Sequence, residues 1–294
     1  MYDIRNIEEA YSVDEAIEKL SENPELRIIA GGTDVLVKIR EGKMEDLDLL
    51  SMHFIEDMRK IEILEDESIR IGALNTFSKI ADDPIINEHI PVLAQAVLTA
   101  GGPQLRNAAT IGGNVCNAAP SADSAPSLFN LDAIVEIAGP DGKKSIPITD
   151  FYIGLGQVDL KPGEFVTGFR ILKENYEGYI GYYFKYAMRN AMDIALSSCG
   201  VNVKLADDMT IESIKACYGV ASTTPVRAYE AEKAYQGKTL NEESIKGFAK
   251  KALEELSPRN SWRASKEVRT QVLYEICVRS LNNCLEVKKG LINA

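Results

Sequence analysis

The spacing of hydrophobic residues predicts that the chain opens with short strands and helices in alternation. We expect an amphipathic helix over Val13–Leu20, because Ser12 and Glu15 have the spacing of a capping box. Three apolar runs then predict a strand, a helix and a second strand: Leu26–Ala30, Asp34–Arg40 and Leu47–Met52. This order is typical of a small parallel βαβ unit.

The pattern then changes to the shorter repeat of antiparallel strands. Two hairpins and a further strand are expected over these segments: Arg59–Leu64 with Ser68–Gly72, Ala133–Ala138 with Lys144–Ile148, and Glu164–Leu172. Between the hairpins, apolar spacing predicts one long helix over Ile85–Ala100, which Gly101-Gly102-Pro103 would end. The middle of the chain therefore combines a mixed or antiparallel sheet with helices.

The last third of the sequence predicts longer strands followed by helices. The strands are expected over Gly181–Ala187, Ala195–Leu205 and Thr210–Ala221, and the helices over Val226–Tyr235, Asn241–Leu256 and Lys266–Val287. We expect a domain boundary near residue 175, which divides the chain into residues 1–175 and 176–294. The predicted class is α+β with two domains.

Composition narrows the kinds of partner. The chain of 294 residues has 33 Lys and Arg against 44 Asp and Glu, a net charge of −11, so nucleic acid or an anionic membrane is not expected as its main partner. The five cysteines form no CxxC pair and the two histidines stand alone, so we expect neither a zinc site nor an iron–sulfur cluster within this chain. Without a signal-like start or a membrane-length apolar run, a cytoplasmic protein is expected.

Two glycine segments are candidate binding sites. They read Ile28-Ile29-Ala30-Gly31-Gly32-Thr33-Asp34-Val35-Leu36 and Thr110-Ile111-Gly112-Gly113-Asn114. Paired glycines let a backbone approach a ligand closely, and successive free N–H groups suit the oxygens of a pyrophosphate. Either segment alone could be a simple tight turn, but the pair favours one extended dinucleotide. The Rossmann and P-loop patterns are missing at both segments, which disfavours those two folds.

These segments, together with two others, resemble the FAD-binding medium subunit of the molybdenum hydroxylases, such as xanthine, nicotinate and carbon monoxide dehydrogenases. The matching stretches read AGGTD from Ala30, RNAATIGGN from Arg106, Ser121-Ala122-Asp123, and FKYAMRNAMDIA from Phe184. The resemblance implies a flavin-binding domain of the vanillyl-alcohol-oxidase type, made of the small βαβ unit and the mixed sheet. A C-terminal domain with a three-stranded antiparallel sheet and helices would follow it.

The resemblance also implies roles for particular residues. The two glycine segments would hold the pyrophosphate and sugars of FAD, and Asp123 would bind a polar part of the cofactor. Gly101 and Val166 would pack against FAD, Lys185 would lie close to the flavin ring, and Ile194 would cover that ring. Asn190 stands where the family often has a second arginine, so its role stays open.

In such an assembly this chain would take electrons from 2Fe-2S clusters in a small partner subunit and pass a hydride to NAD(P)+, while a large subunit would hold the molybdenum-pterin cofactor. No catalytic side chain or metal ligand is predicted in this chain itself. The alternatives are a free-standing flavin oxidase with its own organic substrate and a scaffold subunit without FAD. For single residues, the alternatives are that Asp123 only caps a helix and that Lys185 is a solvated edge charge. Cys116, two residues past the second glycine segment, could be a redox thiol, but a small buried side chain is the favoured interpretation.

Overall fold

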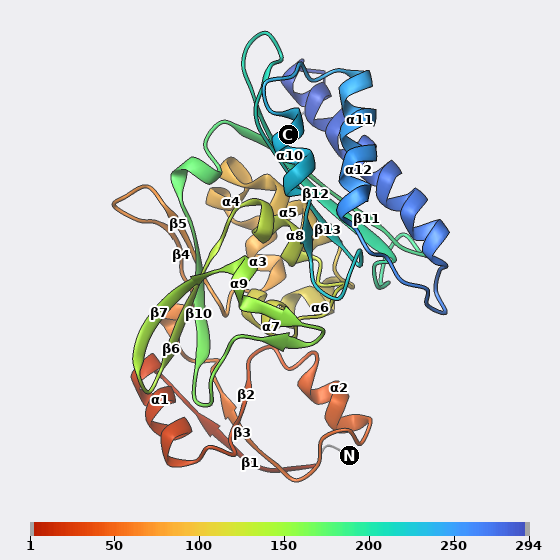
Figure 1. Cartoon of the computed structure of the whole chain (residues 1–294). Helices are drawn as coiled ribbons and strands as arrows, with labels where there is room; N and C mark the ends of the chain where they lie inside the picture. The colour runs from red at the N-terminus through yellow and green to blue at the C-terminus, as the bar shows by residue number, and fades with distance from the viewer. Residues whose placement is uncertain (1–2, 292–294) are drawn as a thin grey trace.

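The computed structural model describes residues 3–291, and its N-terminal lobe is a small parallel sheet at the bottom of Figure 1. The lobe contains β1 (Ile4–Glu9), α1 (Val13–Glu22), β2 (Arg27–Ile29), α2 (Val35–Arg40) and β3 (Leu47–Ser51), with strand order β1-β3-β2. Both strand pairs are parallel, so the predicted βαβ unit is confirmed. β1 was not predicted, because its two isoleucines are separated by polar residues and most of its side chains are exposed.

The central sheet has five antiparallel strands in the order β4-β5-β10-β6-β7. They are β4 (Ile61–Ile63), β5 (Ile69–Gly72), β6 (Ile134–Gly139), β7 (Gly142–Pro147) and β10 (Phe165–Ile171). Both predicted hairpins and the predicted last strand are present. A further small hairpin, β8 (Tyr152–Gly154) with β9 (Gln157–Val158), stands beside this sheet.

Short helices pack around this sheet: η1 (Glu56–Arg59), α3 (Phe77–Asp82), α4 (Pro84–His89), α5 (Pro91–Leu98), α6 (Pro103–Ala108), α7 (Ile111–Cys116), α8 (Ser124–Asn130) and α9 (Ile148–Phe151). The single long helix expected over Ile85–Ala100 is wrong. Pro91 has no N–H to continue a helix, so it ends α4 and begins α5. The predicted stop is present, since Gly101 has a left-handed φ of +51°.

The C-terminal part is an antiparallel sheet covered by helices (Figure 1). Its elements are η2 (Lys173–Asn175), β11 (Tyr179–Tyr186), β12 (Ser197–Leu205), β13 (Ile211–Gly219), β14 (Val226–Arg227), α10 (Tyr229–Tyr235), α11 (Glu242–Ala252), η3 (Leu253–Glu255) and α12 (Lys266–Lys288). The three predicted strands are present, and β14 adds a fourth of two residues. The helix expected from Val226 starts at Tyr229, because Val226 pairs with Tyr218 of β13.

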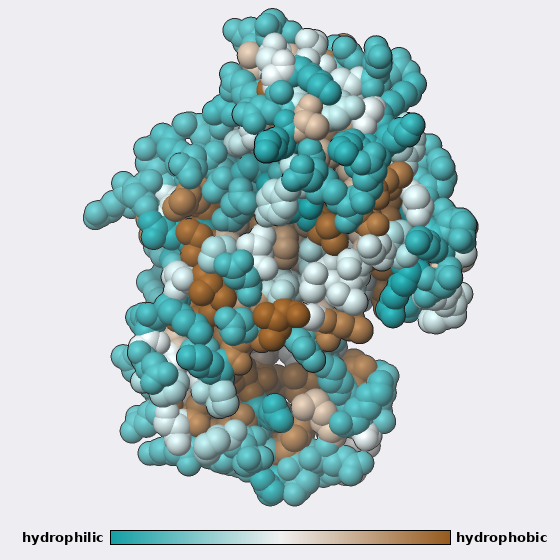
Figure 2. Space-filling model, in the orientation of Figure 1, coloured by the Kyte–Doolittle hydropathy of each residue, from teal (hydrophilic) through white to brown (hydrophobic). Residues whose placement is uncertain are grey.

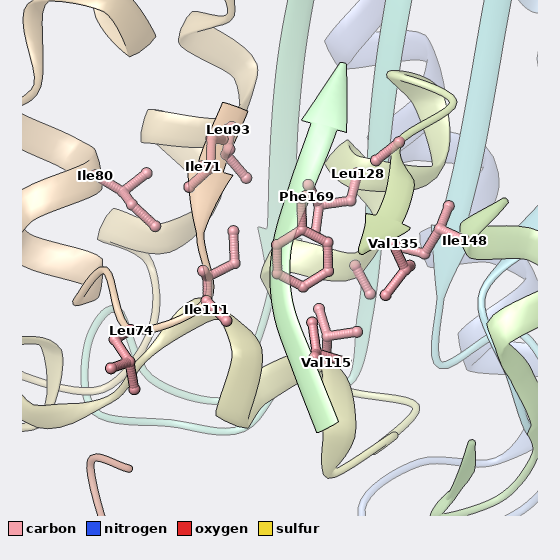
Figure 3. Close-up of a cluster of buried hydrophobic side chains, with 14 of the residues drawn as sticks. Ile71, Leu74, Ile80, Leu93, Ile111, Val115, Leu128, Val135, Ile148 and Phe169 are labelled. Atoms are coloured by element: carbon pink, nitrogen blue, oxygen red, sulfur yellow. The ribbon is translucent and has the colours of Figure 1, made fainter. Parts of the chain in front are cut away.

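Two clusters of buried apolar side chains hold the fold together. In the first, Phe169 of β10 packs between the sheet and the helices, with Ile111 and Val115 of α7 beside it (Figure 3). The second lies between the C-terminal sheet and its helices. An ion-pair network joins the two parts, since the half-buried Asp132 accepts hydrogen bonds from the buried Lys215 at 2.7 Å and the buried Arg227 at 2.8 Å. No helix among residues 3–291 combines the length and apolar character needed to cross a membrane.

Candidate functional site

A cavity with a volume of about 980 Å³ opens where the N-terminal lobe meets the central sheet. Figure 2 shows the molecule hollowed at this level, with hydrophobic residues inside the hollow. Its volume lies at the upper end of the roughly 300–1,000 Å³ usual for ligand pockets. Most of the predicted site residues line it: Ile28, Ala30, Gly31, Gly32, Thr33, Asp34, Val35, Gly101, Thr110, Gly112, Gly113, Asn114, Asp123, Val166 and Ile194.

Four predicted site residues do not line this cavity. Ile111 is fully buried in the core beside Phe169 (Figure 3), so its side chain supports α7 from behind. Ile29 and Leu36 lie behind Gly32, where their methyl groups would come within 3.3 Å and 3.0 Å of an added Cβ. Lys185, the fourth, lines a second cavity of about 610 Å³.

The first glycine segment presents free backbone donors to the cavity. The N–H groups of residues 31–35 have no hydrogen-bond acceptor among the described residues, and all five residues line the cavity. Gly32 has a φ of +72°, which turns the chain into this arrangement. Gly31 is required for a different reason, because a Cβ there would lie 1.8 Å from the carbonyl oxygen of Ala108. The segment fits the anionic oxygens of a pyrophosphate.

The second glycine segment is built differently from the expectation. It is the first turn of α7, and its donors are already paired: Ile111 N donates to Asn75 O at 3.0 Å, Gly112 N to Ala73 O at 2.9 Å and Gly113 N to Thr110 Oγ1 at 3.2 Å. The expectation of successive free N–H groups is therefore wrong at this segment. Gly112 instead allows α7 to pack closely against Ala73, since a Cβ at Gly112 would lie 2.7 Å from the Cβ of Ala73. Gly113 is exposed toward the cavity.

Asp123 forms a buried polar cluster with two residues of β11. Its Oδ1 accepts a hydrogen bond from Tyr183 Oη at 2.9 Å, and its Oδ2 accepts one from Lys185 Nζ, also at 2.9 Å. Lys185 Nζ donates in addition to Thr99 O at 3.0 Å. Burial raises the pKa of the Asp123 carboxyl, and the neighbouring ammonium counteracts this. Burial also raises the pKa of Tyr183 well above its ordinary value, so its hydroxyl remains a donor.

This geometry decides two alternatives. Asp123 occupies the N-cap position of α8, but its side chain makes no capping hydrogen bond, so capping is not the role of this carboxylate. The Lys185 side chain is only 7% exposed and ion-paired, so it is not a solvated edge charge. Asp123 reaches the cavity wall, whereas Lys185 stands behind it.

Several cavity residues lie outside the sequence prediction. Lys38 is a cation in the cavity lining. Its Nζ donates a hydrogen bond to Asn117 Oδ1 at 3.3 Å, and this bond connects α2 to the end of α7. Met192 and Asp193 also line the cavity. Both belong to the stretch from Phe184 that resembles the family, so the sequence contained enough information to include them. Phe165 also lines the cavity, but no pattern in the neighbouring sequence indicated this, because its position is set by the pairing of β10 with β6.

The cavity offers little reactive chemistry of its own. Cys116 lines it, but burial raises the pKa of this thiol to about 12, so it is protonated and weakly nucleophilic at neutral pH. No histidine is among the lining residues. Within residues 3–291 no group of three or more His, Cys, Asp or Glu side chains is arranged to hold a metal ion. A large cavity with a backbone anion site and few reactive side chains defines a dinucleotide-binding protein whose chemistry comes from its cofactor.

Comparison with known proteins identifies the cofactor. Residues 4–171 match the FAD-binding domain of molybdopterin dehydrogenases, and residues 182–284 match the C-terminal domain of carbon monoxide dehydrogenase flavoproteins. The putative xanthine dehydrogenase FAD-binding subunit of Escherichia coli K12 is 36% identical over 290 residues, covering 99% of both chains. The glyceraldehyde dehydrogenase medium chain of Sulfolobus acidocaldarius is 31% identical and covers 92% of this chain and 95% of its own.

A solved structure shows the same fold. The carbon monoxide dehydrogenase of Hydrogenophaga pseudoflava that lacks the Mo-pyranopterin moiety superposes with a TM-score of 0.90 at 24% identity, covering 97% of this chain and 98% of its own. This chain belongs to the family of FAD-binding subunits of the molybdenum hydroxylases. Its cofactor is FAD, and the predicted fold of an FAD-binding domain followed by a flavoprotein C-terminal domain is confirmed.

Proposed function

We propose that this chain is the electron-output subunit of a molybdenum hydroxylase. It would receive electrons from 2Fe-2S clusters of a small partner subunit and deliver a hydride to NAD(P)+, while a large subunit with a molybdenum-pterin cofactor oxidises the organic substrate. We also propose a cytoplasmic location and a division of the chain near residue 175. When bound, FAD supplies the chemistry that links single-electron transfer to hydride transfer.

The observation that carries the proposal is the row of free N–H groups over residues 31–35. These unpaired donors at the cavity wall would hold the pyrophosphate by charge-assisted hydrogen bonds, each worth roughly 1.5–3 kcal/mol. Gly113, exposed and without a side chain, gives the cofactor room opposite this row. Thr110 and Asn114 beside it would contact the sugars.

The Asp123 cluster is the second part of the proposed site. Its carboxylate has lone pairs beyond those used by Tyr183 and Lys185, so it can accept a hydrogen bond from a hydroxyl or ring N–H of the cofactor. Lys185 counteracts the effect of burial on the pKa of that carboxylate and fixes its position by a hydrogen bond. We therefore assign Lys185 to holding Asp123, and we propose that Val166, Gly101 and Ile194 pack against the apolar parts of FAD.

A free-standing oxidase is disfavoured by the cavity lining. Such an enzyme would need an acid–base side chain over the flavin ring. His53 is hydrogen-bonded to Arg59, His89 packs against Tyr176, and neither histidine lines the cavity. Three of the four lining carboxylates already have partners: Asp123 is paired with Lys185, Asp193 accepts two backbone N–H bonds, and Glu164 accepts hydrogen bonds from Lys144 and from Lys161 N. The fourth, Asp34, stands in the first glycine segment, which we assign to the pyrophosphate.

The proposal is tested by mixing the FAD-loaded chain anaerobically with NADH or NADPH in a stopped-flow spectrometer. We expect one of the two to bleach the flavin absorbance near its maximum, whereas xanthine, nicotinate and simple aldehydes leave it unchanged. Direct bleaching by an organic substrate would favour the oxidase. A chain that neither nucleotide reduces would contradict the acceptor assignment.

A further inference from the structure

The connection between β11 and β12, residues 187–196, forms part of the wall of the cavity that we assign to FAD. Three of its residues line that cavity: Met192, Asp193 and Ile194. Bonds inside the connection give it its shape, since Arg189 Nη2 donates to Met192 O at 2.7 Å and Arg189 N donates to the Asp193 carboxylate at 3.0 Å. These internal bonds do not fix where the connection stands on the rest of the fold.

Arg269, near the start of α12, reaches the end of this connection. Its Nη1 donates a hydrogen bond to Leu196 O, and its Nη2 donates to Ser261 Oγ at 2.7 Å. Leu196 N donates to Tyr186 O at 2.8 Å, so the guanidinium holds the residue that closes the connection. One planar side chain therefore joins the cavity wall to α12 and to the loop that precedes this helix.

Arg269 is a buried cation without a counter-ion. It is 4% exposed, and no carboxylate among residues 3–291 lies within ion-pair distance of it. Burial lowers the pKa of this arginine, and the positive charges of Arg259 and Arg263 lower it further. Because burying an unpaired charge destabilises a fold, stability gives no reason for an arginine at this position.

We infer that Arg269 is a positioning residue for FAD, whose hydrogen bonds keep Ile194 and its two preceding neighbours in the cavity wall. The inference rests on the proposed packing of Ile194 against the cofactor. Leu196 stands two residues after Ile194, so a displacement of its carbonyl group displaces the wall. A guanidinium suits this task because its rigid fork serves two acceptors at once. The wall held in this way keeps water away from the flavin.

The first test needs no cofactor. Trypsin cleaves after arginine, and the Arg189 side chain in the connection is 68% exposed. In the FAD-free chain, Arg269→Gln should speed cleavage after Arg189 about tenfold, because a connection without its anchor opens more often. Cleavage elsewhere in the chain should stay unchanged. A rise in cleavage at all sites together with a lower melting temperature would indicate a merely structural role and would overturn the inference.

The second test follows the bound flavin. In the FAD-loaded chain, iodide quenching of the flavin fluorescence should rise about threefold or more in Arg269→Gln, because the displaced wall admits solvent. The dissociation constant of FAD should rise about tenfold, which corresponds to about 1.4 kcal/mol. Unchanged quenching with unchanged cleavage after Arg189 would overturn the inference.

Two control variants separate the hydrogen bonds from the charge. Arg259→Gln removes a charge of the same cluster from an exposed side chain, and it should behave like wild type in both tests. An effect as large as that of Arg269→Gln would overturn the inference.

Arg269→Lys keeps the buried charge but not the planar fork, so it should show the same changes in smaller size. This variant also decides the matter if Arg269→Gln does not fold, since a lysine variant that matches wild type would overturn the inference. A wild-type flavin that iodide quenches as strongly as free FAD would instead contradict the proposed packing of Ile194. The trypsin comparison would then still show whether Arg269 anchors the connection.

Discussion

Replacing Lys185 by methionine should destabilise the protein strongly, because it leaves the Asp123 carboxylate buried without its cation. The two side chains are 7% and 8% exposed and lie 2.9 Å apart, so the pair has little access to water. Removing one partner of such a pair costs about 3–5 kcal/mol. For a chain of this size, the expected fall in the melting temperature of the FAD-free protein is about 6–20 °C. Circular dichroism of the apo protein measures it.

The pH dependence gives this prediction a specific signature. Burial already raises the pKa of Asp123, and loss of the ammonium raises it further. A carboxyl whose pKa is higher in the folded state than in the unfolded state stabilises the fold when protonated, and this stabilisation is lost as the pH rises through the folded pKa. The stability gap between Lys185→Met and wild type should therefore be largest near neutral pH and shrink as the pH falls.

The double variant Asp123→Asn with Lys185→Met is the matched control. Asparagine removes the unpaired charge and keeps an oxygen for the Tyr183 hydroxyl, so the double variant should be more stable than Lys185→Met alone. Three results would contradict this prediction. They are a loss in free energy of unfolding below about 1 kcal/mol in Lys185→Met, a stability gap to wild type that widens toward acid pH, and a double variant that is less stable than Lys185→Met.

Three further predictions concern the glycines and the ion-pair network. Gly113→Val should weaken FAD binding at least a hundredfold, about 2.7 kcal/mol, with an unchanged circular dichroism spectrum, because this glycine faces the cavity; fluorescence titration with FAD measures it. Gly31→Ala should lower both FAD affinity and apo-protein stability, the latter by about 1–3 kcal/mol, since its Cβ would meet Ala108 O; a stable apo variant in thermal melts would contradict this. Arg227→Met should cost about 3–5 kcal/mol in urea unfolding, because this arginine is buried between Asp132 and Glu232; a loss under 1 kcal/mol would show that the network does not join the two parts.

The sequence predicted most of the architecture, and its errors have local physical causes. Strands with apolar runs and helices with caps were found because their signals lie within a few neighbouring residues. β1 was missed because its side chains are polar or exposed, although its backbone pairs with β3. The helix predicted over Ile85–Ala100 was too long because its apolar spacing continues through Pro91, which cannot donate the hydrogen bond that a continuous helix needs.

Most of the residues predicted for the site line one cavity, but their hydrogen bonding could not be predicted from the sequence. The two glycine segments were found, yet only the first keeps its N–H groups free. In the second, the acceptors for Ile111 N and Gly112 N are Asn75 and Ala73, which lie more than thirty residues earlier and come close only through the tertiary fold. The same holds for Asp123 and Lys185, which are separated by 62 positions in the chain. Contacts of this range leave no periodic signal in a sequence.

The most direct test of the account is the flavin content of the purified chain. We predict a yellow protein that carries one FAD per chain and releases it completely into the supernatant on acid precipitation, because residues 31–35 would hold the pyrophosphate by hydrogen bonds alone. The cavity offers no histidine and only a protonated cysteine for covalent attachment. A colourless chain that takes up no added FAD, or flavin that stays on the precipitated polypeptide, would contradict it.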